Sequence, residues 1–178
     1  TIHNDITNTH QSGRIWVGEK FSSAVSSRSF SFSIPNAIQG ANTGIKYALS
    51  SVSNTNSSFK VSINGASQNH YFSQGNRYMY QGVIRNIQLG SSGKCNIEIS
   101  YSFNESMAAG YLDYIEINAP SALSFTESQT PFRHISQNDS SCFYQFQLGN
   151  SSQKVRVWNI GNPCNVYELS TTLNNNIS

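Results

Sequence analysis

The strongest signal along the chain is an alternation of apolar and polar residues with a period of two. In residues 95–103, Cys, Ile, Ile, Tyr and Phe occupy every second position, with polar residues between them. Such alternation indicates a strand with one buried and one solvated face, which is typical of antiparallel sheets. The same rhythm recurs in five other stretches: 30–34, 45–49, 59–63, 142–148 and 155–157.

The residues between these stretches are turn formers. Asn64-Gly65 directly follows an alternating stretch and predicts a tight hairpin turn, because both residues accept a positive φ. Pro35 ends the strand predicted at 30–34, since proline has no N–H to donate to a sheet. Nowhere do apolar residues recur at a spacing of three to four over a dozen residues, so we expect almost no helix. About nine short strands predict an all-β fold, an antiparallel two-sheet sandwich or jelly roll.

The chain length favours one domain. Its 178 residues suffice for one well-buried core and are too few for two domains of ordinary size. No repeat is visible, and the best candidate boundary is Asn-Ala-Pro-Ser at 118–121, after a strand at 111–117. We therefore expect a single β-sandwich domain over 1–178. Its core would lie in 12–119, and 120–178 would add strands that pack on the sandwich or complete it.

Composition narrows the class of protein. Hydrophobic residues make up only 37%, but ten Phe, nine Tyr and two Trp bury enough area to anchor a core. Charged residues make up only 11%, while Ser and Asn are abundant; we take this as a hint of an extracellular β protein. The net charge is +2 and the basic residues are scattered, which argues against nucleic-acid binding.

Targeting signals and membrane segments are not visible. No apolar run approaches the length of about 18–20 residues that spans a bilayer, and no signal peptide stands at residue 1. Because the sequence begins at Thr1 and not at a methionine, we expect a mature chain or a segment excised from a longer protein.

The cysteines do not form a recognisable site. There are three, Cys95, Cys142 and Cys164, and an odd count rules out a fully paired disulfide framework. Cys95 and Cys142 occupy apolar positions and are interpreted as buried thiols; one disulfide that involves Cys164 stays open. No pair has the spacing of a zinc site and no Asp-rich loop predicts calcium, so we expect no metal and no cofactor.

Candidate catalytic groups are also dispersed. His3, His10, His70 and His134 have no adjacent acid or thiol and are interpreted as surface or turn residues, although folding could still assemble a Cys/His pair. A glycosidase needs two carboxylates that face one cleft. Asp113 lies three residues from Glu116 in a predicted strand, so the two would point to opposite faces. We expect no active site in this chain.

One group of aromatic residues allows two interpretations. Tyr71, Tyr78 and Tyr80 flank a turn at Gly75-Asn76. We favour core packing, because buried rings are the ordinary material of a core. The second interpretation is that exposed rings stack against sugars, as in carbohydrate-binding modules.

The segment 110–119 (Gly-Tyr-Leu-Asp-Tyr-Ile-Glu-Ile-Asn-Ala) has apolar residues at both odd and even positions. Strict alternation would put Leu112, Tyr114 and Glu116 on one face, and Asp113, Ile115 and Ile117 on the other. Apolar groups on both faces predict a central or doubly covered strand. Asp113 must then find polar partners, and we expect it to accept hydrogen bonds from the backbone amides of a neighbouring loop.

Three stretches together resemble one family. They are Gly-Arg-Ile-Trp-Val-Gly-Glu-Lys-Phe at 13–21 with Phe-Ser-Phe-Ser-Ile-Pro at 30–35, the segment 110–119, and Pro-Phe-Arg at 131–133 with Val-Trp-Asn-Ile-Gly-Asn-Pro at 157–163. From about residue 12 to 169, their order and spacing resemble the β-rich region that precedes the peptidase domain in the PorU family. These proteins are the signal peptidases (sortases) of type IX secretion, of the gingipain type of cysteine peptidase. The matching residues are Trp16, Gly18, Glu19, Leu112, Asp113, Tyr114, Glu116, Phe132, Arg133, Trp158 and Pro163.

The third stretch departs from the family pattern. Asn159 and Gly161 stand where the family usually has Asp and Thr, which removes a charged turn-capping group and puts a role of that Asp in doubt. Trp16 and Phe21, in the first stretch, are candidates to cover one edge of the sandwich.

The resemblance implies a setting and partners. Family members act at the outer membrane of Gram-negative bacteria, where they remove the C-terminal sorting domain from secreted cargo and attach the cargo to a surface lipopolysaccharide. Their catalytic Cys and His belong to the downstream domain, so no catalytic residue carries over. We expect an exported, cell-surface accessory domain. Its partners would be the downstream peptidase domain and, beyond it, cargo or outer-membrane secretion components.

Two other functions stay open at this stage. A carbohydrate-binding module of a secreted or surface protein is the first alternative, since a jelly roll with the motif at 111–117 also resembles such modules. A stand-alone enzyme is the second, and it would require hydrolytic activity from a chain this short.

Overall fold

The structure is a computed structural model, and it describes residues 2–8, 16–75, 79–125, 129–133, 144–149 and 155–172. The described residues form strands and one 3-10 turn (Ser91–Gly93), without an α-helix. The expected all-β class is therefore confirmed. The chain divides into two compact units, Thr1–Ala122 and Leu123–Ser178, which are described separately. Our expectation that 120–178 adds strands to the sandwich stays a prediction.

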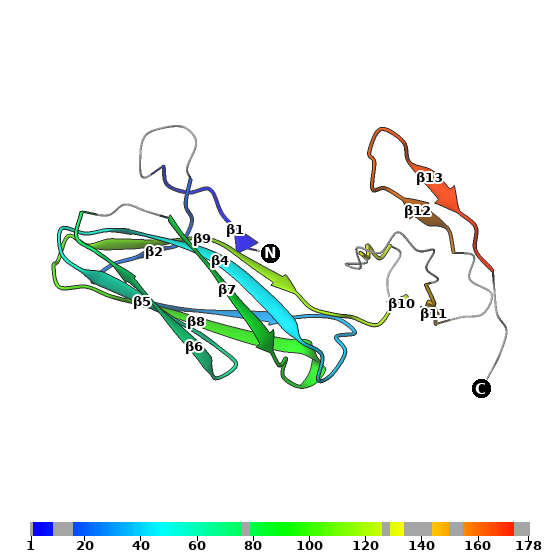
Figure 1. Ribbon diagram of the computed structural model, residues 1–178, viewed down its shortest axis with the longest axis horizontal. Helices are drawn as coiled ribbons and strands as arrows, with labels where there is room; N and C mark the ends of the chain where they lie inside the picture. Colours follow the sequence, from blue (N-terminus) through cyan, green and yellow to red (C-terminus); the bar gives the residue numbers. More distant parts are fainter. Residues whose placement is uncertain are drawn as a thin grey trace. The chain divides into compact units, whose positions relative to one another are not determined.

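The first unit is a sandwich of two antiparallel sheets (Figure 1). One sheet has the order β1-β9-β4-β7, with β2 also pairing with β9, and the other has the order β3-β8-β5-β6. The bounds are β1 (Ile2–His3), β2 (Lys20–Phe21), β3 (Ser27–Ser33), β4 (Thr43–Val52), β5 (Ser57–Ile63), β6 (Ala66–Phe72), β7 (Met79–Ile87), β8 (Lys94–Ser102) and β9 (Ala109–Asn118).

The two sheets share one apolar core. Along β8 the residues alternate between buried and exposed, as the period-two pattern predicted, and the buried ones join the inner faces of β4, β5 and β9. Phe59 lies among the aromatic rings of this core. Its ring centroid is 5.4 Å from that of Phe21, 5.8 Å from Phe72 and 4.5 Å from Tyr101. Phe21 is thus a core residue rather than an edge cover, whereas Trp16 is partly exposed.

The predicted hairpin turn is confirmed. Asn64 (φ 44) and Gly65 (φ 92) connect β5 to β6, and positive φ at both central residues is the signature of the tight turn that matches strand twist. The Asn64 side chain also reaches the neighbouring strand, because its Oδ1 accepts a hydrogen bond of 2.9 Å from the backbone N–H of Asn96.

Strand β9 departs from strict alternation. Ala48 pairs with Tyr114 and Leu49 pairs with Leu112, so the register against β4 skips Asp113. This β-bulge shifts the alternation by one residue, and both Leu112 and Ile115 lie in the same buried core. The predicted division of faces, with these two on opposite sides, is therefore wrong. An extra residue in one strand bends the ladder locally and re-aims a side chain, which sequence alternation cannot reveal.

The second unit contains two small pairs of strands. β10 (Ser124–Phe125) pairs in parallel with β11 (Gln147–Leu148), and β12 (Val157–Asn159) pairs antiparallel with β13 (Tyr167–Leu169). Of the strand predicted at 142–148, only its last two residues are in β11, and the part from 142 to 143 lies outside the described residues.

The thiols partly follow expectation. Cys95 is buried and Cys164 is exposed, and both are free; Cys142 lies outside the described residues. In the described part of the chain, no helix is long and apolar enough to cross a membrane.

Candidate functional site

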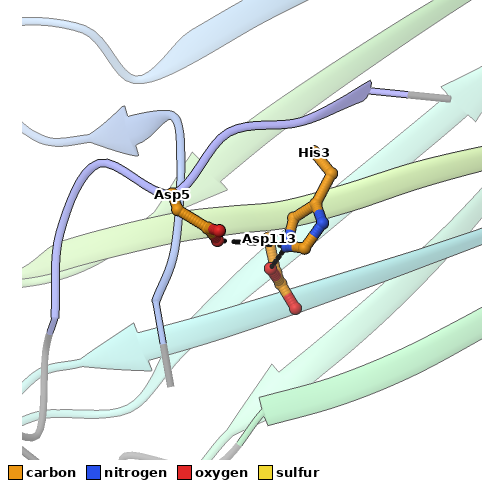
Figure 2. A group of neighbouring side chains, drawn as sticks. All are labelled: His3, Asp5 and Asp113. Atoms are coloured by element: carbon orange, nitrogen blue, oxygen red, sulfur yellow. Dashed lines mark ion pairs between the residues drawn. The ribbon is translucent and has the colours of Figure 1, made fainter. Parts of the chain in front are cut away.

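Three side chains with metal-ligating atoms meet beside β9: His3, Asp5 and Asp113 (Figure 2). The Nε2 atom of His3 lies 3.2 Å from Oδ1 of Asp5 and 3.2 Å from Oδ1 of Asp113. One ligand atom from each of the three residues lies within 4.8 Å of the other two. Within the described ranges this is the one group of three or more such residues.

Two short strands bring this cluster together by sharing one edge of β9. β1 pairs with Tyr114 and Ile115, and β2 pairs with Gly110 and Tyr111. Asp113 therefore lies at the junction where β2 has ended and β1 has begun. Because Asp113 is also the bulged residue, its carboxylate is turned toward His3 of β1 (Figure 2).

The chain before β2 closes the junction. The N–H of Gly18 donates to the carbonyl oxygen of Leu112, and the N–H of Leu112 donates to that of Glu19. A Cβ atom at Gly18 would lie 2.8 Å from the carbonyl oxygen of Asn4, so only glycine allows this approach without a shift. The Nδ2 of Asn4 in turn donates to Oε1 of Glu19 over 2.6 Å.

The cluster contains a largely buried carboxylate, that of Asp113, whose charge faces the imidazole of His3. The Asp113 residue is 8% exposed and its side chain 12%, and its Oδ1 is buried without a hydrogen-bond partner. The contact of this oxygen with Nε2 of His3, at 3.2 Å, is an ion pair. Burial raises the pKa of Asp113; the nearby His3 lowers it and Asp5 raises it further. A buried carboxylate is costly without an opposite charge beside it, so this atom favours a cationic neighbour.

The partner predicted for Asp113 was different. We expected hydrogen bonds from the backbone amides of a loop. Among the described residues, no such amide donates to Oδ1. His3 and Asp5 were not grouped with Asp113, because the sequence separates them by more than one hundred residues. One signal was present: two polar ligand types two residues apart in an extended segment point to the same side.

The other family-like residues fall in two places. Gly18, Glu19, Leu112, Asp113 and Tyr114 gather at the junction of β1, β2 and β9. Glu116 lies further along β9, where its Oε1 accepts from Nδ2 of Asn118.

Apart from the exposed Trp16 in the first unit, the remaining residues of the motif belong to the second unit. Phe132 packs against the rings of Tyr144 and Phe146, with centroids 5.2 and 5.1 Å apart. The guanidinium of Arg156 lies over the ring of Trp158, 5.0 Å from its centroid. Arg133 and Pro163 are exposed.

The aromatic residues considered for sugar stacking do not act as one group. Tyr71 is 81% exposed on β6, so the core-packing interpretation is wrong for this residue. It alternates with His70 and Phe72, which take the inward positions of the strand. Tyr78 and the side chain of Tyr80 lie outside the described residues.

One histidine is buried, contrary to expectation. His70 is 4% exposed, and its Nε2 lies 2.6 Å from Oη of Tyr47 in the facing sheet. It occupies an inward position of β6 because alternation along the strand places it there. Burial lowers the pKa of His70. His3 is exposed, and His10 and His134 lie outside the described residues.

Comparison with known proteins gives likeness in fold. No protein-family model matches the chain, and no curated protein matches it. The solved structure of dimeric latent PorU from Porphyromonas gingivalis is similar with a TM-score of 0.60 and 18% identity, over 70% of this chain and 13% of that chain. The chain thus corresponds to a small part of the length of PorU, and at this identity the likeness shows a shared fold.

Two carbohydrate-binding modules have weaker likeness. One is module CBM36 in complex with calcium and xylotriose, with a TM-score of 0.42 and 17% identity over 66% of this chain and 89% of that one. The other is the CBM36-1 domain of a multidomain xylanase from the hindgut metagenome of Trinervitermes trinervoides, with a TM-score of 0.46 and 14% identity over 68% and 89%.

Proposed function

We propose that this chain is a non-catalytic accessory domain of a type IX secretion signal peptidase. It would position the peptidase domain of the same protein, or contact secreted cargo or outer-membrane secretion components. The observation that carries the proposal is the shared fold with one region of PorU, which covers 70% of this chain. The three family-like stretches of the sequence support it independently, and five of their residues form the junction beside β9.

The state of Cys95, one of the three thiols, supports a role without catalysis for this residue. A nucleophilic cysteine needs a lowered pKa and access to substrate. Cys95 is buried, and burial raises the pKa of its thiol, which is the opposite condition. The proposal therefore assigns peptide cleavage to another domain and places the whole protein, exported, at the cell surface.

The test uses the complete gene product. We expect a downstream domain with a Cys/His pair, and a protein lacking residues 1–122 that still cleaves a short peptide but no longer processes a cargo with its C-terminal sorting domain. Cargo processing is followed by the mass of the released domain. A gene product without such a peptidase domain, or full cargo processing after the deletion, would refute the proposal.

A second candidate function is carbohydrate binding, and one observation favours it. Tyr71 stands exposed on the outer face of the four-stranded sheet, whose outward residues are mostly uncharged and polar, with Lys60 and Glu98 among them. The outward residues around it include Ser58, Ser62, Ser67, Asn69, Ser100 and Ser102. An exposed ring among hydroxyl and amide groups suits stacking against a sugar.

A glycan array separates the two candidates. Saturable binding that Tyr71→Ala abolishes would favour the carbohydrate-binding function. Tyr167→Ala is the matched control, because Tyr167 is also an exposed tyrosine but lies in the second unit. An array without any binding would leave the accessory function as the better proposal.

A further inference from the structure

We propose that His3, Asp5 and Asp113 bind a divalent transition-metal ion, with zinc as the best match, and that the ion fastens β1 to β9. The inference does not depend on the proposed function. It rests on the meeting of three ligand atoms from segments far apart in sequence, and on the buried oxygen of Asp113, which faces the imidazole of His3 at 3.2 Å.

The spacing of the ligand atoms fits a zinc ion. Zinc binds nitrogen and carboxylate oxygen at about 2.0–2.2 Å in tetrahedral sites, which puts two ligand atoms about 3.4 Å apart. His3 Nε2 lies 3.2 Å from each of the two carboxylate oxygens, close to this value. The third separation, between the carboxylates, is within 4.8 Å. The two exposed side chains, His3 and Asp5, could close it by small rotations.

The oxygen of Asp113 is the observation that points to a ligand. It is buried, and the contact drawn for it is the ion pair of 3.2 Å with Nε2 of His3 (Figure 2). A protonated His3 between two carboxylates would satisfy part of its charge. A metal ion satisfies all three groups at once, since it takes a lone pair from the neutral imidazole and from each carboxylate.

The mixture of donors selects the kind of metal. Calcium and magnesium prefer sites made of oxygen ligands, whereas imidazole suits zinc and its neighbours in the first transition row. Three protein ligands also leave a fourth position for water or for a group from a partner. Glu19, whose Oε2 is buried without a hydrogen-bond partner, lies near the same junction but is not one of the three.

The proposed ion would strengthen a weak attachment. β1 consists of only Ile2 and His3, so it contributes a very short ladder to β9. Two of the three ligands come from this N-terminal segment and the third from the bulge of β9. An ion bound only when these parts are together stabilises that arrangement by mass action.

The experiment titrates zinc chloride into the untagged, EDTA-treated chain by calorimetry. We expect one ion per chain, and a rise in the unfolding midpoint of about 5 °C or more at a zinc concentration of about 100 times Kd. Calcium and magnesium should leave the midpoint unchanged. Cobalt should give the intense visible bands of a four-coordinate site, a readout that a change in stability alone would not produce.

Variants decide whether these residues are the ligands. Asp113→Asn and His3→Gln should each weaken zinc binding by about tenfold or more, and the cobalt bands should disappear. His3 is exposed, so His3→Gln stays informative even where the change at the buried Asp113 impairs folding. Glu116→Gln is the control, because it removes a carboxylate from the same strand outside the cluster, and it should bind zinc as the wild type does. Absence of zinc binding, or equal binding by His3→Gln, would overturn the inference whatever the cargo assay shows.

Discussion

Gly82 illustrates a constraint set by a single residue. It pairs directly with Tyr47 across β7 and β4, and the tyrosine ring covers it. A Cβ atom at Gly82 would lie 2.3 Å from the ring carbons of Tyr47. Tyr47 is fully buried, and its Oη lies 2.6 Å from Nε2 of His70. A glycine at this position is therefore what allows an aromatic ring to lie across an edge strand.

We predict that Gly82→Ala destabilises the fold by about 1–3 kcal/mol through overpacking. Gly44→Ala is the control, because a Cβ atom there meets nothing within 4 Å, and its effect should stay within about 0.5 kcal/mol. Urea denaturation followed by tyrosine and tryptophan fluorescence measures both. Equal effects of the two substitutions would contradict the packing argument.

His70 gives the fold a pH dependence of defined sign. Burial lowers its pKa below the ordinary value, so the unfolded chain takes up a proton before the folded chain does. Stability from this residue is complete above the unfolded pKa and is lost as the pH falls through the folded pKa. We predict that the free energy of unfolding falls more steeply from about pH 7 to about pH 5 in the wild type than in His70→Gln. Parallel pH profiles for the two proteins would show that His70 does not titrate as described.

Asp113 shows how far sequence reasoning reaches at this scale. Its need for a partner followed from one carboxylate within an apolar strand. The identity of that partner did not, because it depends on a bulge and on the return of the N-terminal segment to β9. Neither leaves a pattern in the local sequence. His70 was missed for a related reason, since its strand carries few apolar residues.

At the scale of elements, alternation predicted the strands that have one face in the core. The stretches 30–34, 45–49, 59–63 and 95–103 lie largely in β3, β4, β5 and β8. β6 was not predicted, because most of its residues are exposed and its alternation of apolar and polar residues is therefore weak. β1 and β2 contain two residues each, too few to carry a period, and yet they build the candidate metal cluster.

The β5–β6 hairpin offers a test of one element. The side chain of Asn64 both suits its φ of 44 and links the turn to the neighbouring loop, where its Nδ2 donates to the carbonyl oxygen of Gln88 over 2.9 Å. Asn64→Ala should therefore cost about 1–3 kcal/mol. Asn64→Gly keeps the turn and loses only the side-chain bonds, so it should cost less. Thermal unfolding of both variants measures the difference, and an Asn64→Gly protein as unstable as Asn64→Ala would contradict a conformational contribution.

At the scale of the whole molecule, the first unit closes on itself. Ser121 forms an antiparallel bridge with Ala37, and the N–H of Ala122 donates to the carbonyl oxygen of Asn36. The nine strands that the structure describes in the sandwich lie before this point. The second unit holds short strand pairs and an aromatic group around Phe132.

We predict that a chain ending at Ala122 folds with the same free energy of unfolding as the full chain, to within about 0.5 kcal/mol. Its sandwich core and closing bridge lie entirely within the retained residues. Circular dichroism and chemical denaturation provide the measurement. A truncated chain that is clearly less stable would instead support the expectation that residues 120–178 complete the sandwich.

The division of one β9 edge between two very short strands has a consequence for other polypeptides. If β1 dissociates from Tyr114 and Ile115, the backbone N–H and carbonyl groups on that edge of β9 become unpaired. An extended peptide can then pair with them as an added strand. The N-terminal segment therefore blocks this edge. A competing peptide must displace the two paired residues of β1 and break the contacts of His3 within the cluster. Removing the N-terminal segment would leave this edge of β9 open to pairing with a strand from another polypeptide.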